Sequence, residues 1–231
     1  MCNLYSLTKG QAAIVALVRA MRDRTGNLPA MPGIFADMLA PVVRTARDGV
    51  RELMLMRWGF PPPPNLGTRP VTNIRNVGSP YWQGWIADPR FRCLVPATSF
   101  CEYTDTTPKI PHWFALEAGR PLFAFAGIWR PWTGVRGTKK APVEGEHRLF
   151  GFLTCEANDV VRPVHAKAMP VILTLPEEFE TWLRAPAEEA LALQRPLPNE
   201  ALNVVMTGAK EDDGQGLGEV DAAPQLKLAF E

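Results

Sequence analysis

The chain has 231 residues, of which 46% are hydrophobic and 21% are charged, enough to bury one substantial core in one large domain. A net charge of +1 argues against a protein that coats duplex DNA by charge alone, although a few arginines and lysines suffice for a short single-stranded site. No apolar run approaches the ~18 residues of a membrane span, and no basic patch precedes an apolar stretch at the N-terminus. We therefore expect a cytoplasmic protein that does not contact membranes.

The few cysteines and histidines limit which chemistries the chain can support. Four cysteines are scattered without C-x-x-C spacing, at Cys2, Cys93, Cys101 and Cys155. A structural zinc site or a disulfide framework is therefore not expected. Each cysteine is either a small buried hydrophobe or a reactive thiol. The three histidines leave few candidates for acid–base work.

The first part of the chain predicts one helix followed by short strands. Residues 8–21 favour a helix, because Ile14, Leu17 and Val18 recur at helical spacing. Thr8 is a suitable N-cap for this helix. Two β-like runs follow at 42–45 and 53–60. The run of prolines from Pro61 to Pro64 then ends any strand and predicts an extended surface loop.

The rest of the chain predicts a succession of strands with two more helices. The predicted strands are residues 92–100, 113–116, 122–129, 149–154 and 171–175. The predicted helices are residues 81–87 and 176–184, the second beginning at Pro176. Residues 133–147 hold several glycines and lysines and predict an exposed loop.

Together these elements predict a single α+β domain. Its core is a curved antiparallel, partly barrel-like β-sheet flanked by helices. We expect this domain to span residues 1–209, and residues 210–231 to form a polar, partly mobile C-terminal tail.

Cys2 has distinctive chemistry if Met1 is removed, because one residue then carries a free α-amine beside its own thiol. The amine has a reference pKa of roughly 7.7–8.0, so an appreciable fraction is neutral and nucleophilic near pH 7. Such an aminothiol condenses with an aldehyde to an imine, and the sulfur then closes a thiazolidine ring. Ring-opened abasic deoxyribose is an aldehyde of this kind. By position alone, Cys2 is more often a small residue near an unprocessed terminus.

The neighbours of Cys2 strengthen this interpretation. Five stretches occur in order: Met1-Cys2-Asn3-Leu4-Tyr5; Arg57-Trp58-Gly59-Phe60; Thr72-Asn73-Ile74-Arg75; Cys93-Leu94-Val95-Pro96-Ala97 with Phe100-Cys101-Glu102-Tyr103; and Leu153-Thr154-Cys155-Glu156-Ala157-Asn158 with His165-Ala166-Lys167-Ala168-Met169-Pro170. This series resembles the SRAP family, the SOS-response-associated peptidases or abasic-site-processing proteins. The likeness covers about residues 2 to 185.

The resemblance implies catalytic roles for Cys2 and three other residues. Asn73 would hold the N-terminal amine through its side-chain carbonyl. Glu102 follows a predicted strand among apolar residues, where a raised pKa would suit a general acid and base. His165 would stabilise charge on the sugar oxygen or relay a proton. Without the family match, Asn73 is more often a turn residue and His165 a satisfied core residue.

Two basic residues are the predicted DNA contacts. Arg75 and Lys167 each lie two positions beyond a proposed catalytic residue, so in an extended segment they would share its face and bind phosphates. Trp58 is interpreted as a core residue, and Arg136, Lys139 and Lys140 as a solvated loop.

The sequence also departs from the family pattern, which bears on how it would grip DNA. Family members often carry a basic residue where this chain has Leu4, and aromatic residues where it has Pro61 to Pro64. The histidine motif usually has one fewer residue before Met-Pro. These departures leave the predicted catalytic residues in place. They do not allow the sequence to predict how the protein binds DNA, or whether it prefers single strands or junctions.

The hypothesis is a DNA-repair protein, expected as a monomer, that crosslinks Cys2 to abasic sites in single-stranded DNA and shields them. No metal or diffusible cofactor is required. The resemblance also implies an autopeptidase that exposes Cys2, although ordinary aminopeptidases would remove one Met. Two alternatives stay open: an N-terminal-nucleophile cysteine amidase that acts on a small amide, and a non-catalytic binder of single-stranded DNA.

Overall fold

The computed structural model describes residues 2–63, 67, 69–138 and 140–214. Its helices are α1 (Gln11–Val18), α2 (Pro80–Ala87), α3 (Pro176–Arg184) and α4 (Ala187–Leu191), with 3-10 turns at Pro89–Phe91 and Asn199–Ala201. Its strands are β1 (Leu4–Leu7), β2 (Arg22–Asp23), β3 (Met31–Phe35), β4 (Leu39–Thr45), β5 (Arg51–Trp58), β6 (Asn73–Ile74), β7 (Arg92–Ala97), β8 (Ser99–Tyr103), β9 (Pro111–Ala115), β10 (Phe123–Thr138), β11 (Ala141–Cys155), β12 (Met169–Pro170), β13 (Ile172–Leu173) and β14 (Asn203–Thr207).

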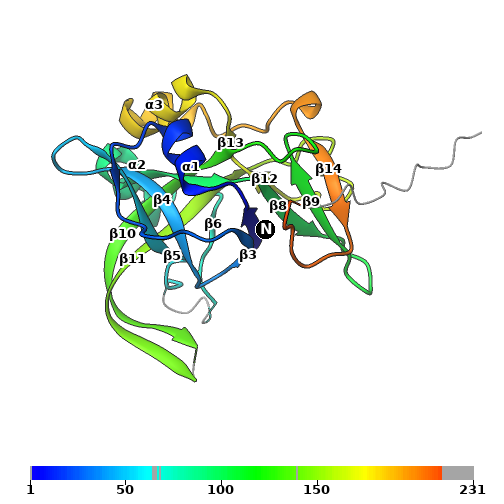
Figure 1. The fold of residues 1–231 in the computed structure, drawn as a ribbon, viewed down its shortest axis with the longest axis horizontal. Helices are drawn as coiled ribbons and strands as arrows, with labels where there is room; N and C mark the ends of the chain where they lie inside the picture. Colours follow the sequence, from blue (N-terminus) through cyan, green and yellow to red (C-terminus); the bar gives the residue numbers. More distant parts are fainter. Residues whose placement is uncertain (1, 64–66, 68, 139, 215–231) are drawn as a thin grey trace, which may run out of the picture.

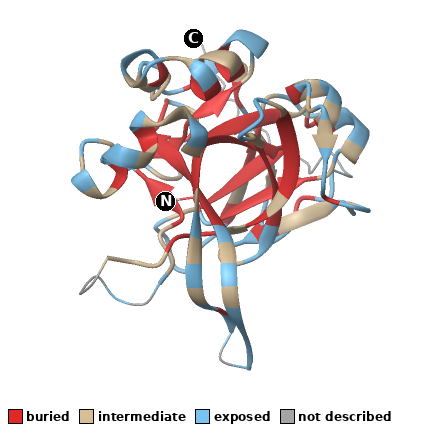
Figure 2. Cartoon of the chain, turned by 90° about the vertical axis from the view of Figure 1, so that its left-hand side faces the viewer, coloured by how far each residue is buried: buried red, intermediate tan, exposed pale blue. Residues whose placement is uncertain are grey.

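The larger sheet closes on itself into a barrel (Figure 1). Its strands run in the order β12-β11-β10-β7-β4-β5-β2, and β11 also pairs with β5 in parallel, through Leu149↔Arg57 and Phe150↔Trp58. Closure removes the open edges of the strands between β11 and β5. Figure 2 shows these buried strands surrounding the core. The predicted curved, barrel-like α+β fold is therefore confirmed.

The smaller sheet carries the N-terminal strand. Its order is β14-β9-β8-β1-β3, and β1 lies between β8 and β3. Tyr5 of β1 projects into the barrel, where its ring meets those of Trp58, Phe125 and Phe152 edge-on, with centroids 5.0, 5.6 and 6.1 Å away. These rings come from three different strands, so Tyr5 fixes the start of the chain to the main core.

Several predicted elements are confirmed. The helix predicted at 176–184 is α3, and the helix predicted at 81–87 is α2, which begins one residue earlier. The predicted runs at 42–45 and 53–60 correspond to β4 and β5, and the run at 113–116 to β9. Trp58 is fully buried, as expected of a core residue.

The first helix is shorter than the predicted 8–21. It begins after Gly10, because the backbone N–H and the hydroxyl of Thr8 are bonded to Thr98 Oγ1 and do not cap the helix. It ends at Arg19, whose left-handed φ of 50° stops the helix. Met21 then donates its N–H to the carbonyl of Arg51, and its side chain is 83% exposed.

The strand predicted at 92–100 is two strands, β7 and β8, which belong to different sheets. The chain changes sheet at Thr98, whose N–H donates to the carbonyl of Ser6. The hydroxyl of Ser6 bonds there to the hydroxyls of both Thr98 and Ser99, so these buried polar groups at the break are satisfied. The strand predicted at 171–175 is shorter in the structure, where it is β13 (Ile172–Leu173), and β12 (Met169–Pro170) precedes it.

The prediction of an exposed loop at 133–147 is wrong, because this segment forms a β-hairpin that extends from the barrel (Figures 1 and 2). We call it the arm: the outer halves of β10 and β11, paired from Pro131↔Arg148 to Thr138↔Ala141. Its glycines favour turns, but backbone pairing and a long-range ion pair override that preference. Arg136 bonds the carboxylate of Asp37 at 2.5 Å, so Arg136 is not part of a solvated loop. Lys140 is exposed, and Lys139 lies outside the described residues.

The chain beyond residue 209 continues into contact with the core. Asp212 is fully buried, accepts a hydrogen bond from Ser99 at 2.6 Å and pairs with Arg120 at 3.3 Å. Residue 212 of the predicted tail is thus tied to β8. Residues 215–231 lie outside the described residues. Within the described part of the chain, no helix is long and apolar enough to cross a membrane.

Gly151 of β11 permits the close approach of the segment that carries Asn73. A Cβ there would lie 2.9 Å from the Phe60 ring and 3.1 Å from the carbonyl oxygen of Thr72. We expect Gly151→Ala to lower the free energy of unfolding by about 1–3 kcal/mol, measured by denaturant titration. Gly84→Ala is the control, because nothing lies within 4 Å of a Cβ there and alanine is favoured in helices by about 1 kcal/mol. Equal stability of the two variants would contradict this packing.

Candidate active site

Cys2 lies just before β1, where the smaller sheet meets the barrel. The antiparallel register of β1 and β8 pairs Leu4 with Cys101 and Tyr5 with Phe100, so the chain before Leu4 runs alongside Glu102. Cys2 has no exposed surface in this chain, which retains Met1. Its thiol donates to the carbonyl of Leu4 at 3.4 Å. Burial, and next the negative charge of Glu102, raises the pKa of the thiol, so it stays protonated at neutral pH.

Asn73 is the residue that directly holds Cys2. It belongs to β6, which pairs in parallel with β11 through Asn73↔Phe152. The side-chain amide nitrogen of Asn73 donates to the carbonyl of Cys2 at 2.7 Å. Its amide oxygen is buried and has no hydrogen-bond partner among the described residues. A buried acceptor without a donor is costly, so this oxygen is suited to bind a donor near Cys2.

Thr72 orients Asn73, a role that the sequence motifs did not predict. Its hydroxyl donates to the side chain of Asn3 at 2.9 Å and accepts from the amide of Asn73 at 2.7 Å. The indole N–H of Trp58 donates to the carbonyl of Thr72 at 3.3 Å. Core residue Trp58 therefore supports the site as well. The only sequence signal for Thr72 was its place beside Asn73 in the motif.

Glu102 is a buried carboxyl near Cys2 whose pKa suits proton transfer at neutral pH. It is 3% exposed near the end of β8, and burial raises the pKa of its carboxyl to about 7. Its charge acts on the Cys2 thiol, which places the two side chains close together. At neutral pH Glu102 is present in both protonation states, and so can give or take a proton.

His165 lies in the turn that precedes β12, and is half-buried. Its Nδ1–H donates to the carbonyl of Ala168 at 3.1 Å, since a carbonyl oxygen can only accept. Burial lowers the pKa of His165, while the negative charge of Asp105 opposes that shift. The imidazole is therefore neutral near pH 7. The influence of Asp105 places His165 near the chain that follows β8.

The predicted DNA contacts are both exposed. Arg75 follows β6 and borders a pocket of about 180 Å³ that Cys155 and Gln194 also line. Lys167 lies in a turn, so the extended geometry expected between His165 and Lys167 is wrong. Neither Arg75 nor Lys167 forms an ion pair with a described residue, so both positive charges are available to phosphates.

Two positions depart from the family pattern: Leu4 and the proline run from Pro61 to Pro64. Leu4 is buried in β1, between β3 and β8, where its side chain packs with Cys101 and Trp113. Of the proline run, Pro61 to Pro63 are partly exposed and Pro64 lies outside the described residues. The carbonyl of Pro61 accepts a bond from the hydroxyl of Tyr81 at 3.4 Å, which ties the run to α2.

The cysteines, histidines and acidic residues that the structure describes show no arrangement for a metal. All four cysteines are buried and free. Among the residues that the structure describes, no group of three or more His, Cys, Asp or Glu could hold an ion. What the site offers is a thiol, an unpaired amide oxygen, a carboxyl that titrates near neutrality and a neutral imidazole.

Comparison with known proteins establishes the family. A family model described as SOS response associated peptidase (SRAP) matches residues 1–209. The chain belongs to the SRAP family. The resemblance inferred from the motifs is therefore confirmed, and the matched residues include every candidate site residue.

Curated relatives of this SRAP protein match it over a shorter stretch. The abasic site processing protein YoqW of Bacillus subtilis strain 168 is 35% identical over 94 residues, 40% of this chain and 38% of the relative. YobE of the same organism, also named an abasic site processing protein, is 33% identical over 94 residues with the same shares. The match thus spans well under half of the relatives' length.

Solved structures share the fold. A Bordetella bronchiseptica protein has a TM-score of 0.68 and 21% identity, covering 90% of this chain and 98% of that one. A Bacteroides thetaiotaomicron protein has a TM-score of 0.64 and 20% identity, covering 89% and 92%. At these identities the likeness establishes the fold alone.

The raised pKa of Glu102 makes stability depend on pH. The unfolded carboxyl titrates near ~4.3 and the folded one near 7, so the folded state holds this proton more firmly. The contribution is complete below the unfolded pKa and is lost as pH rises through the folded pKa. Between about pH 4 and 8, wild type should lose on the order of 3 kcal/mol relative to Glu102→Gln.

Denaturant titrations of both proteins across this pH range measure the difference. Groups that titrate in both proteins cancel in the comparison. Parallel stability curves for wild type and Glu102→Gln would show that the carboxyl is not held in its protonated form.

Proposed function

We propose that this protein processes abasic sites in DNA by forming a covalent thiazolidine between Cys2 and the ring-opened sugar. The observation that carries the proposal is the hydrogen bond between the side chain of Asn73 and the backbone of Cys2. The amide nitrogen bonds the Cys2 carbonyl at 2.7 Å while the amide oxygen stays buried and unpaired. The names of the two Bacillus subtilis relatives agree with abasic-site processing.

Removal of Met1 is the first requirement. It creates the α-amine on Cys2, a residue that is fully buried in the structure. An aminopeptidase or the protein's own peptidase activity would hydrolyse the Met1–Cys2 peptide bond. The amide oxygen of Asn73 would then accept a hydrogen bond from the new amine and orient its lone pair toward the sugar.

The carbon–nitrogen bond forms next. As the closed sugar opens, Glu102 donates a proton to the ring oxygen and takes up the proton that the C1′ hydroxyl loses, which leaves the aldehyde. The amine nitrogen adds to C1′, and loss of water leaves an imine. Neutral His165 would hydrogen-bond the sugar oxygen while charge develops on it.

The thiol then completes the ring. The Cys2 sulfur adds to the imine carbon, the carbon–nitrogen π bond opens, and the thiol proton passes to nitrogen. Because burial keeps the thiol protonated, this proton is already present in the site. No oxidant, metal or cofactor enters the balance.

Single-stranded DNA is the proposed substrate. The free charges of Arg75 and Lys167 would bind phosphates on either side of the lesion. A strand without a partner can present the abasic sugar to a residue that lies between two sheets. A monomer would be sufficient for this reaction. It would act in the cytoplasm, on the DNA of the nucleoid.

Cys2→Ala separates the two nucleophiles, because the processed variant keeps an α-amine and lacks the thiol. We expect wild type to give a heat-stable mass adduct on abasic single-stranded DNA and none on intact DNA. Cys2→Ala should give no stable adduct, yet an imine that borohydride reduction traps. Cys93→Ala, which removes a thiol from the barrel interior, should crosslink like wild type.

The same experiment tests the alternatives. A non-catalytic binder would retain DNA without a mass adduct in any variant. An amidase would hydrolyse small amides and leave abasic DNA unmodified. A stable adduct with Cys2→Ala equal to that of wild type would exclude ring closure by the thiol.

The pH profile tests the part played by Glu102. Crosslinking needs the α-amine in its neutral form, which becomes the major form above roughly pH 7.7–8.0. It also needs Glu102 in its protonated form, which becomes the minor form above about pH 7. The initial rate should therefore follow a bell-shaped curve. In Glu102→Gln the rate should fall by about 10²-fold or more and the alkaline limb should disappear. An alkaline limb retained by the variant would assign the proton donor to another group.

A further inference from the structure

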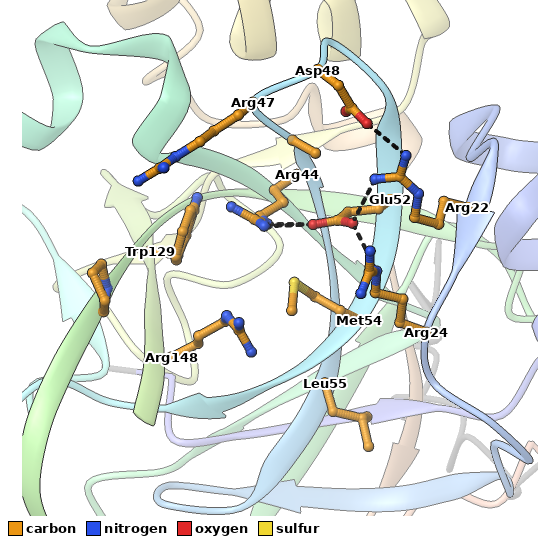
Figure 3. Close-up of a pocket in the computed structure, with 12 residues that line it drawn as sticks. Arg22, Arg24, Arg44, Arg47, Asp48, Glu52, Met54, Leu55, Trp129 and Arg148 are labelled. Carbon is orange, nitrogen blue, oxygen red and sulfur yellow. Dashed lines mark hydrogen bonds and ion pairs between the residues drawn. The ribbon is translucent and has the colours of Figure 1, made fainter. Parts of the chain in front are cut away.

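The end of the barrel near Trp129 and Arg148 opens into an arginine-lined pocket of about 660 Å³ (Figure 3). Arg44, Glu52 and Trp129 occupy the same alternating positions of their strands as the core residues Val42, Trp58 and Phe125. Their side chains therefore face the inside of the barrel. The pocket shares no lining residue with the candidate site around Cys2.

A buried carboxylate organises the inner part of this pocket. Glu52 is 2% exposed and is surrounded by three guanidinium groups, with Arg44 at 2.5 Å, Arg24 at 3.1 Å and Arg22 at 3.4 Å. Burial would raise the pKa of Glu52, but the hydrogen bond and charge of Arg44 lower it overall, so it stays ionised. Arg44 is also stacked on Trp129, 4.4 Å from the ring centroid. These arginines are held in place before any ligand arrives.

The pocket holds more positive charge than its own acids neutralise. Five arginines line it against two carboxylates, Glu52 and Asp48. Arg22 pairs with Asp48 at 2.6 Å as well as with Glu52. Arg47 and Arg148 are exposed at the rim, and their guanidinium groups form no ion pair or hydrogen bond with any described residue. Figure 3 shows the side chains of Arg44 and Arg148 pointing into the pocket.

We propose that this barrel mouth binds a phosphate-bearing ligand through Arg47 and Arg148, at a site separate from Cys2. Guanidinium groups match the geometry of phosphate oxygens and pair with them in a bidentate manner. The volume lies within the range of about 300–1,000 Å³ that small-molecule sites occupy. The phosphate can come from a free di- or triphosphate or from the backbone of the bound DNA.

Calorimetric titration of the full chain with inorganic pyrophosphate and with ADP tests the proposal. Wild type should bind at one site, with an affinity that falls as salt is added. Arg47→Gln/Arg148→Gln should weaken this binding by about tenfold or more. The control Lys9→Gln/Lys210→Gln removes two exposed charges outside the pocket and should bind like wild type. No saturable binding, or equal affinity in the arginine variant and wild type, overturns the proposal.

A second titration identifies the source of the phosphate. If the ligand is DNA, the arginine variant should also bind oligodeoxythymidine more weakly, and pyrophosphate should compete with the oligonucleotide. If it is a free phosphate compound, oligonucleotide affinity should be unchanged. Crosslinking by Cys2 at saturating abasic DNA should persist in the arginine variant in both cases, which separates this proposal from the proposed function.

Discussion

The pairing of β1 with β8 is the constraint on which the rest of the site depends. Leu4↔Cys101 and Tyr5↔Phe100 set the register, and Tyr5 fixes it by inserting among Trp58, Phe125 and Phe152 in the barrel. A one-residue slip would turn Tyr5 out of the core, so the register is strongly specified. The chain before Leu4 therefore reaches the buried carboxyl of Glu102.

The site joins rigid supports from different parts of the chain. Asn73 is held by Thr72, which is held by the indole of Trp58, so the group that contacts Cys2 is tied to the aromatic core. Gly151 lets this segment approach β11. Preorganisation of this kind would favour the proposed reaction, because misplacement of a nucleophile is costly in rate.

The two ends of the barrel have different electrostatic character. Near Cys2 and Glu102, burial disfavours charge, so the pKa of the thiol is raised and the pKa of the carboxyl rises to about 7. At the other mouth, arginines outnumber carboxylates and Glu52 stays ionised. The candidate site around Cys2 and the arginine-lined pocket thus differ in charge, although one domain carries both.

The sequence by itself determined the family and the candidate site residues. Cys2, Asn73, Glu102 and His165 lie in short local motifs, and α3 has its start and apolar face encoded within a few residues, so both were predictable. The tertiary structure decided what depends on distant pairing: the break of the predicted strand 92–100 at Thr98, and the arm, which Arg136 ties to Asp37. It also decided the contacts of Thr72 and the assembly of the arginine-lined mouth, whose residues are far apart in the chain. Contacts between such residues come from sheet closure and register, which local sequence patterns do not specify.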